Sequence, residues 1–400
     1  MREIAIIGGG AAGCFCAAEI ARLHPDWSVR VYEAGPRLMA KLAITGGGRC
    51  NITNSFARIC DTTTDDLKWV YPRGANLMKK LLHSFGPADC LRWFGERGVR
   101  FVTQDDGCVF PASQDAMQIV HTLERAMRDG GVKVFCNSKV ASISINLTVS
   151  FADGSSVRPD AVVLTTGGAT AHLLEGTGIT LVPDVPSLFT FKIADDGLRS
   201  LMGTVVDRVT LGLAGTRFRS HGTLLLTDWG VSGPATLRLS SYAAQWLAEH
   251  QYRASLLVNW LDASETEVRE RLSAMSEGAR TIANSHPAEL SERLWRMLVE
   301  RAGIRPDARW AELGSKGLAR IVNVLISDTY DVIGRARFKE EFVTCGGVDL
   351  SEVDPSAMAS RRIPGLYFAG EVLDIDAVTG GFNLQAAWTT AWAVAHAILL

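Results

Sequence analysis

The stretch REIAIIGGGAAG (residues 2–13) joins a short apolar run to glycines spaced as G-x-G-x-x-G. Because the run is rich in β-branched residues, it predicts a strand buried on both faces. Gly8 permits a tight turn, Gly10 lets a pyrophosphate approach the backbone, and Gly13 lets helix and strand pack closely. The small, apolar residues 11–23 predict a helix whose free N–H groups face the turn and form an anion site.

A second strand is predicted over residues 29–32, and Glu33 stands at its end, twenty positions after Gly13. A carboxylate at this place accepts hydrogen bonds from a ribose 2′-hydroxyl. Strand, glycine turn, helix and acid together indicate a bound dinucleotide. The alternative is a glycine-rich turn with a purely structural role.

Length and composition bound the class of protein. A chain of 400 residues exceeds what one core fills, so two or three domains are expected. The net charge of −2 argues against a strongly basic nucleic-acid surface, although a local patch could hide in it. The eight cysteines form no C-x-x-C pattern, which predicts reduced thiols in a cytoplasmic protein without a metal site. Because the chain is predicted to start directly in a strand, no signal peptide is expected, and no apolar stretch is long enough to predict a membrane span.

Two further glycine segments follow the first. Residues 41–54 contain Gly46-Gly47-Gly48-Arg49-Cys50-Asn51, which predicts a loop, neither helix nor strand, that wraps an anionic or polar cofactor. A flexible surface loop is the alternative. The apolar strand 161–165 runs into Thr166-Gly167-Gly168, where backbone is expected to approach the cofactor.

The pattern changes at about Pro186. Residues 188–193, 203–212 and 223–227 alternate like antiparallel strands of a sheet or barrel. Helical spacing follows over 264–277 and 287–302, and strands return near 335–344. The last helix is predicted to open at residues 379–385, a second glycine-led helix end that can stabilise negative charge; a capped helix packed on a sheet is the alternative.

These motifs together resemble the aminoacetone oxidase family of FAD-binding proteins. The resemblance is carried by IIGGGAAG (6–13), GGGRCNITN (46–54), VFPAS (109–113), the glycine pair 167–168, GVSGPA (230–235) and the run 345–385. It implies an α/β fold with a discontinuous Rossmann-type FAD-binding domain at 1–186 and 344–400. An inserted antiparallel, barrel-like β domain is expected at 187–262 and 316–343, and a small helical subdomain at 263–315.

The resemblance also implies where FAD lies. The pyrophosphate is expected on the first glycine turn, the adenosine ribose on Glu33, and the adenine at the Val140 backbone. Gly370, Glu371 and Asp374 are expected near the ribityl chain and pyrophosphate, and residues 380–384 at the isoalloxazine edge. The full predicted set is Gly8, Gly10, Ala11, Ala12, Gly13, Glu33, Ala34, Lys41, Gly46, Gly47, Gly48, Arg49, Cys50, Asn51, Val140, Thr166, Gly167, Gly168, Gly370, Glu371, Asp374, Gly380, Gly381, Phe382, Asn383 and Leu384.

Arg49, Cys50 and Asn51 are the catalytic candidates on the substrate side. Arg49 either binds a substrate carboxylate or carbonyl or holds the loop. Cys50 is either a redox thiol or a small pocket-lining residue, and the absence of a partner cysteine at redox spacing favours the second interpretation.

The expected function is an FAD-dependent oxidoreductase that oxidises an amine or reduces a C=C bond of a small molecule. No second G-x-G-x-x-G is present, so NAD(P)H would reduce the flavin only as a transient visitor. Two other classes stay open: an FAD-dependent tRNA-modifying enzyme, against which the near-neutral charge counts, and a non-catalytic flavin-binding redox sensor.

Overall fold

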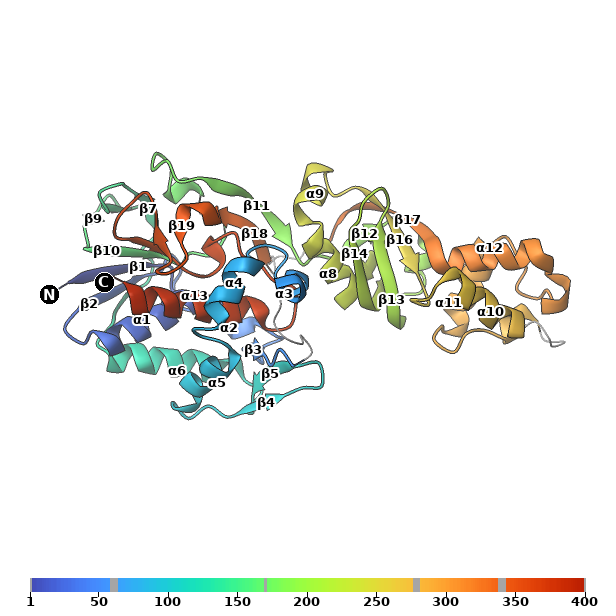
Figure 1. Cartoon of the computed structure of the whole chain (residues 1–400), viewed down its shortest axis with the longest axis horizontal. Coiled ribbons are helices and arrows are strands. Elements are labelled where there is room, and N and C mark those ends of the chain that lie inside the picture. Colours follow the sequence, from blue (N-terminus) through green and yellow to red (C-terminus); the bar gives the residue numbers. More distant parts are fainter. Residues whose placement is uncertain (1, 58–63, 169–170, 276–280, 337–342, 399–400) are drawn as a thin grey trace. The chain divides into compact units, whose positions relative to one another are not determined.

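The computed structural model describes residues 2–57, 64–168, 171–275, 281–336 and 343–398. The chain divides into two compact units, which are described separately below. Unit 1 comprises Met1–Val185 and Val343–Leu400, and unit 2 comprises Pro186–Phe342. Both chain ends lie in unit 1 (Figure 1).

Unit 1 is built on one seven-stranded sheet to which both ends of the chain contribute. Its order is β19-β20-β21-β10-β1-β2-β6, and β21, β10, β1, β2 and β6 run parallel. The strands are β1 (Glu3–Ile7), β2 (Ser28–Tyr32), β6 (Lys133–Phe135), β10 (Ala161–Leu164), β19 (Val353–Asp354), β20 (Ala359–Ser360) and β21 (Leu366–Phe368). The continuous apolar run of β10 is wholly buried, as expected of a strand covered on both faces.

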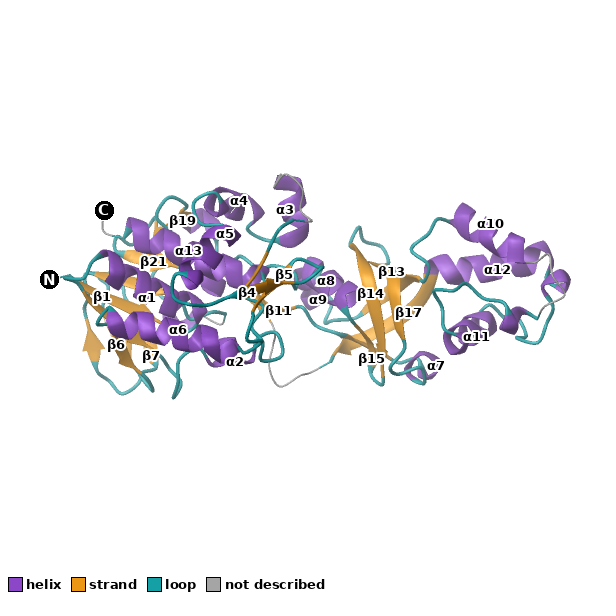
Figure 2. Cartoon of the chain, turned by 90° about the horizontal axis from the view of Figure 1, so that it is seen from below, coloured by secondary structure: helices purple, strands orange, loops and turns teal. Residues whose placement is uncertain are grey.

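Helices α1 (Ala11–Leu23), α6 (Ala116–Asp129) and α13 (Phe382–Ala397) pack side by side in this unit (Figures 1 and 2). The predicted bounds of α1 are confirmed. The last helix, α13, is buried along most of its length, including Trp388, and serves as a core helix. The part of the chain that the structure describes contains no helix that is both long and apolar enough to cross a membrane.

Shorter elements complete unit 1. The helices are α2 (Ala40–Ile44), α3 (Thr64–Val70), α4 (Ala75–Leu82), α5 (Pro87–Gly95), η2 (Ala171–Leu173), η5 (Leu350–Glu352) and η6 (Gly370–Val372). The small sheets pair β3 (Thr53–Asn54) with β5 (Cys108–Pro111) and β4 (Phe101–Thr103), β7 (Val140–Ile143) with β8 (Val149–Phe151) and β9 (Ser156–Val157), and β11 (Leu181–Ser187) with β18 (Val343–Val348). The prediction that 41–54 is loop throughout is wrong at both ends, because α2 and β3 form there.

Unit 2 contains a closed barrel. Its order is β12 (Phe191–Ile193), β15 (Gly230–Ser232), β14 (Arg219–Thr227), β13 (Val205–Leu213), β16 (Ala254–Asn259) and β17 (Asp328–Arg335). Its helices are α7 (Asp196–Arg199), α8 (Pro234–Tyr242), α9 (Ala244–Glu249), α10 (Glu265–Met275), α11 (Glu292–Arg301), α12 (Gly314–Ser327), η3 (Ile282–Asn284) and η4 (Trp310–Glu312). One apolar cluster runs from the barrel into the helices, joining Leu211, Trp260 and Leu294. The predicted α/β class, with a Rossmann-type domain and a barrel, is confirmed.

Local predictions in unit 2 need correction in several places. The helix expected from Pro287 begins only at Glu292, because the hydroxyl of Ser291 accepts the N–H of Leu294 and caps it there. The returning strand expected near 335–344 corresponds to parts of two strands: β17 begins earlier, at Asp328, and ends at Arg335, and β18 begins at Val343. Residues 337–342 of that range lie outside the described residues. Helix α12 extends past residue 315 into the range assigned to the β domain.

Candidate functional site

The first glycine turn brings β1 and α1 into close contact. A Cβ atom built on Gly13 would lie 2.0 Å from the carbonyl oxygen of Gly8, and Gly8 itself has a φ of +107°. A Cβ built on Gly10 meets no atom within 4 Å, so this residue faces open space. The turn therefore has one tightly packed side and one side free for a ligand.

The N-terminus of α1 opens toward this free side. The first hydrogen bond of the helix runs from the N–H of Cys14 to the carbonyl of Gly10. The N–H groups of Ala11, Ala12 and Gly13 consequently have no acceptor within the helix and carry its positive dipole end. The arrangement can bind an anion without a lysine or arginine.

The carboxylate of Glu33 binds the backbone of the glycine turn. Its carboxylate accepts the N–H of Gly9 at 2.7 Å and that of Gly35 at 2.7 Å. Its backbone carbonyl accepts the N–H of Ser138, two residues before Val140 at the start of β7. The structure thus gathers Glu33, the exposed Ala34 and the beginning of β7 on one side of the glycine turn.

The glycine segment 46–54 has a strained backbone. Gly46, Gly47 and Gly48 have φ values of +63°, +70° and +82°, and Cys50 has a φ of +60°. Left-handed conformations in sequence suit glycine and are costly for cysteine, so the surrounding contacts hold the loop in this shape. Cys50 is fully buried, and burial raises the pKa of its thiol to about 12.

Arg49 lies on the exposed side of this loop. Its guanidinium stacks on Phe110, with Cζ 4.4 Å from the ring centroid, and its Nε donates to the carbonyl of Gly46 at 3.3 Å. The stacking fixes the direction of the side chain and leaves the terminal nitrogens at the surface of the loop.

The same segment packs directly on the start of α13, more than 300 positions away in sequence. Thr53 Oγ1 donates to Gln385 Oε1 at 2.6 Å, Asn54 Nδ2 donates to the carbonyl of Gly380 at 3.0 Å, and Trp388 Nε1 donates to the carbonyl of Ile52 at 3.0 Å. Gly381 has a φ of +88°, and a Cβ there would lie 2.4 Å from the carbonyl oxygen of Thr53. The predicted cofactor segments 46–54 and 379–385 are therefore in direct contact.

Two buried side-chain oxygens in this region, Asn51 Oδ1 and Asp374 Oδ1, have no hydrogen-bond partner among the residues that the structure describes. Asn51 Oδ1 lies 2.7 Å from the position that a Cβ on Gly381 would take, so it sits beside the N-terminus of α13. Burial raises the pKa of Asp374. Because buried polar atoms are nearly always satisfied, both oxygens suit a ligand that brings hydrogen-bond donors.

Glu371 lies close to two other predicted cofactor residues or segments, Lys41 and the glycine pair 167–168. Its carboxylate accepts the N–H of Thr344 at 2.7 Å and lies 4.0 Å from Lys41 Nζ. Burial raises its pKa, against the opposing charge of Lys41. Gly167 and Gly168 pack here as well, since a Cβ on Gly167 would be 3.4 Å from Glu371 and one on Gly168 would be 2.7 Å from Thr344.

The predictions missed the contacts that fix the chain leading into α13. Arg73 forms a two-pronged ion pair with the buried Asp376, and Tyr71 donates its hydroxyl proton to the carbonyl of Phe382 at 3.0 Å. Burial lowers the pKa of Arg73, but the hydrogen bonds and charge of Asp376 outweigh this effect and raise it overall. Asn383, which was expected to contact FAD, uses its carboxamide to bond the N–H and carbonyl of Ala377. No local motif signals these pairs, because their members lie far apart in sequence.

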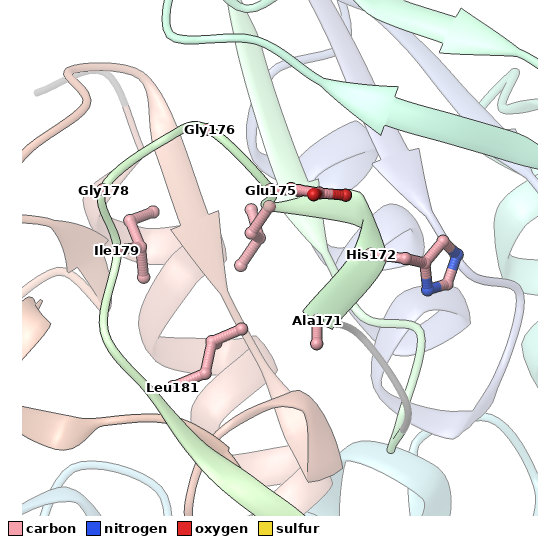
Figure 3. Close-up of a pocket in the computed structure, with 8 residues that line it drawn as sticks. Ala171, His172, Glu175, Gly176, Gly178, Ile179 and Leu181 are labelled. Carbon is pink, nitrogen blue, oxygen red and sulfur yellow. The ribbon is translucent and has the colours of Figure 1, made fainter.

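A separate hollow of about 690 Å³ lies along the chain that follows β10, over residues 171–181 (Figure 3). Ile179 and Leu181 point into it, whereas the ring of His172 points away. Its lining mixes apolar residues with glycines, His172 and Glu175. In the part of the chain that the structure describes, no cluster of three potential metal ligands is found.

Comparison with known proteins agrees with this architecture. The family model described as "HI0933-like protein Rossmann domain" matches residues 2–397. The chain is 27% identical to a 3-dehydro-bile acid delta(4,6)-reductase of Clostridium scindens over 99% of both proteins. It is 29% identical to a ribosomal RNA dihydrouridine synthase of Escherichia coli over 98% of this chain and 97% of that protein.

Among solved structures, a 3-ketosteroid-delta4-(5alpha)-dehydrogenase of Rhodococcus jostii shares the fold. The TM-score is 0.52 at 14% identity, with 98% of this chain and 96% of the other covered. The match of the family model to almost the whole chain decides the assignment. The chain belongs to the HI0933-like Rossmann-domain family and is an FAD-dependent oxidoreductase.

Proposed function

We propose that this protein reduces a carbon–carbon double bond conjugated to a carbonyl group, with FAD bound between the first glycine turn and the start of α13. The names of two relatives support this reaction class, because a delta(4,6)-reductase and a dihydrouridine synthase both saturate such a bond. Their substrates differ in size and polarity, so the shared feature is the reaction and not the substrate.

The unpartnered Asn51 Oδ1 beside the N-terminus of α13 is the observation that carries the proposal. In this proposal the oxygen accepts an N–H of the flavin ring, and the free amides at the start of α13 stabilise negative charge on the ring edge. When bound, FAD supplies hydride transfer. The hydrogen bonds that join Thr53 and Asn54 to α13 hold the two sides of the site in register.

The first glycine turn supplies the other half of the binding site. The N–H groups of Ala11, Ala12 and Gly13 bind the pyrophosphate, and the open side of Gly10 leaves room for its approach. The carboxylate of Glu33 already accepts two backbone N–H groups. Each of its oxygens retains a lone pair, so it can also accept a ribose hydroxyl.

Arg49 is the proposed substrate-binding residue. Its stacked guanidinium keeps its terminal N–H groups free to bind the substrate carbonyl and to stabilise the charge that develops on it during reduction. Cys50 is buried behind the loop with a raised pKa, which favours a packing role over a redox role.

An RNA substrate is the second candidate. It is favoured by relatives named as ribosomal RNA dihydrouridine synthases in Escherichia coli and Haemophilus influenzae, each 29% identical to this chain. The near-neutral charge of the chain therefore does not exclude an RNA partner. Amine oxidation, suggested by the aminoacetone oxidase resemblance, is the third reaction to test.

Anaerobic mixing of FAD-loaded protein with NADH, NADPH or a panel of amines tests the proposal. Loss of the visible flavin band with a nicotinamide, followed by its return on adding a cyclic enone or a uridine-containing RNA, is expected. Saturated product is then identified by mass spectrometry. Bleaching by amines alone would instead establish an oxidase.

The variant Arg49→Gln tests whether Arg49 acts in the reduction of the substrate and not in the reduction of the flavin. Because the guanidinium is proposed to stabilise developing charge, we expect kcat to fall about 100-fold while reduction by the nicotinamide is unchanged. The control is Arg128→Gln on α6, where the side chain is 74% exposed and outside the site. Equal kcat values for the two variants would remove Arg49 from the mechanism.

A further inference from the structure

A second cavity, of about 630 Å³, lies at the end of α1 opposite the glycine turn. Ala18 is the first lining residue on α1 and Arg22 the last; they lie seven and eleven positions after Ala11, which is about 10 and 16 Å along the helix. Arg22, Arg97 and Arg125 line this cavity, and we call it the arginine cleft. Asp129 of α6 also lines it.

Arg97 is fixed in place at the cleft. Its Cζ lies 3.6 Å from the centroid of the Trp93 ring, and its NH1 donates to the carbonyl of Trp93 at 2.7 Å. Burial lowers its pKa, and the charge of Arg22 lowers it further against the opposing charges of Glu19 and Glu96. The guanidinium is thus pre-positioned close to a second cation.

The buried carboxylate of Glu19 fixes the orientation of Arg22. Its Nε and NH2 donate to the two carboxylate oxygens of Glu19 at 3.1 and 2.6 Å. Glu19 is only 2% exposed and also accepts Trp93 Nε1 at 2.9 Å, so its carboxylate is fully engaged beneath the cleft. The Arg22 side chain remains 50% exposed and lines the cleft, and its NH1 is not used in the bonds to Glu19.

Arg125 and Asp129 complete the charge balance. Arg125 stands on the exposed face of α6, and its guanidinium makes no ion pair with any residue that the structure describes. Asp129 is the one carboxylate among the described lining residues, and it lies 3.8 Å from Arg128, outside the cleft. Beside the lining, Glu19 pairs with Arg22 and Glu96 lies 4.0 Å from Arg97, so Arg125 is the guanidinium for which the described residues supply no ion pair. The cavity has the size that small ligands fill.

We propose that the arginine cleft binds a phosphate group, carried by a free nucleotide or by the backbone of an RNA strand. Guanidinium groups form paired, charge-assisted hydrogen bonds to phosphate oxygens, and a phosphate would supply the anionic partner that Arg125 does not have among the described residues. The cleft is remote from the flavin site, so this binding goes beyond the proposed reduction and does not depend on it.

Titration of the FAD-loaded protein at low salt tests the proposal, with inorganic pyrophosphate, adenosine monophosphate and a short single-stranded RNA as probes. Calorimetry and thermal unfolding are the readouts. We expect Arg125→Gln to weaken binding of the preferred probe about tenfold, because one charge-assisted contact is lost. Asp129→Asn should strengthen it, because a carboxylate leaves the cleft. Arg128→Gln, the neighbouring arginine outside the cleft, should change it less than twofold.

The pattern of probes identifies the source of the phosphate. Tight RNA binding with weak nucleotide binding assigns the cleft to an RNA backbone, and the reverse assigns it to a nucleotide. Equal binding by the Arg125 and Arg128 variants, or no binding of any probe, overturns the proposal. The readout uses no reductant, and the comparison of these variants is valid with or without FAD, so its failure is distinct from failure of the proposed reduction.

Discussion

Replacing Gly13 by alanine tests how closely α1 must approach β1. The new methyl group would lie 2.0 Å from the carbonyl oxygen of Gly8 and 2.6 Å from Thr165 Oγ1. Ordinary contact begins near 3.4 Å, so helix and turn must separate by about 1.4 Å.

Hydrogen bonds hold the Gly8 carbonyl in place, so it cannot easily move away from the new methyl group. It accepts the hydroxyl of Thr165 at 2.8 Å, and the N–H of Gly8 is bonded to the carbonyl of Tyr32 at 2.8 Å. Overpacking costs about 1–3 kcal/mol, and a constrained site takes the upper end of that range. Alanine regains about 1 kcal/mol through its helix propensity, so the net loss of stability is about 2 kcal/mol.

Hydrogen exchange of the α1 amides in the apoprotein measures the loss of stability, and a titration with FAD measures the change in cofactor affinity. The exchange reports on unit 1 alone, which matters because the two units need not unfold together. The control is Gly10→Ala, whose φ of −81° tolerates alanine and whose Cβ meets nothing within 4 Å. Its apoprotein should lose less than about 0.5 kcal/mol. Its affinity for FAD should nevertheless fall at least tenfold, because the methyl group occupies the space through which a phosphate approaches.

Two results would refute this reasoning. One is a Gly13→Ala apoprotein that exchanges as slowly as the wild type, which would mean that the helix moves freely away from the strand. The other is unchanged FAD affinity in Gly10→Ala, which would place the pyrophosphate elsewhere.

Three further predictions concern other contacts. Thr53→Val leaves the buried carboxamide of Gln385 without its donor and should destabilise unit 1 by about 1–3 kcal/mol in chemical denaturation; an unchanged midpoint would contradict this. Because burial raises the pKa of Cys50 to about 12, iodoacetamide at pH 8 should label it only after unfolding, and rapid labelling of native protein, seen by mass spectrometry, would contradict its burial. Burial raises the pKa of Asp262, but hydrogen bonds led by that of Thr210 outweigh this and lower it overall, so its stabilising contribution is present at neutral pH and is lost as the pH falls through the lowered pKa. The melting temperature should therefore change less between pH 7 and pH 3 in Asp262→Asn than in the wild type. The same dependence of melting temperature on pH in both proteins would argue against a stabilising hydrogen bond between Thr210 and the Asp262 carboxylate.

Elements whose pattern is local could be predicted from the residues alone. The apolar run 2–7, the glycine spacing and the small residues 11–23 specify strand, turn and helix within one short segment, and α1 has the predicted bounds. Alternation likewise predicted the barrel strands β12, β13 and β14, but β15 (Gly230–Ser232) and β16 (Ala254–Asn259) were not predicted. Element ends were less accurate where a single cap decides them, as Ser291 does for α11.

Which distant groups meet could be seen only in the folded protein. The bond between Thr53 and Gln385, the ion pair between Arg73 and Asp376, and the arrangement of the arginine cleft each join separate parts of the chain. A hydrophobic pattern records which face of an element is buried, but it does not record the partner that buries it. Partners are chosen when the whole core packs, and the paired glycine segments of the proposed flavin site therefore become one site only in the folded protein.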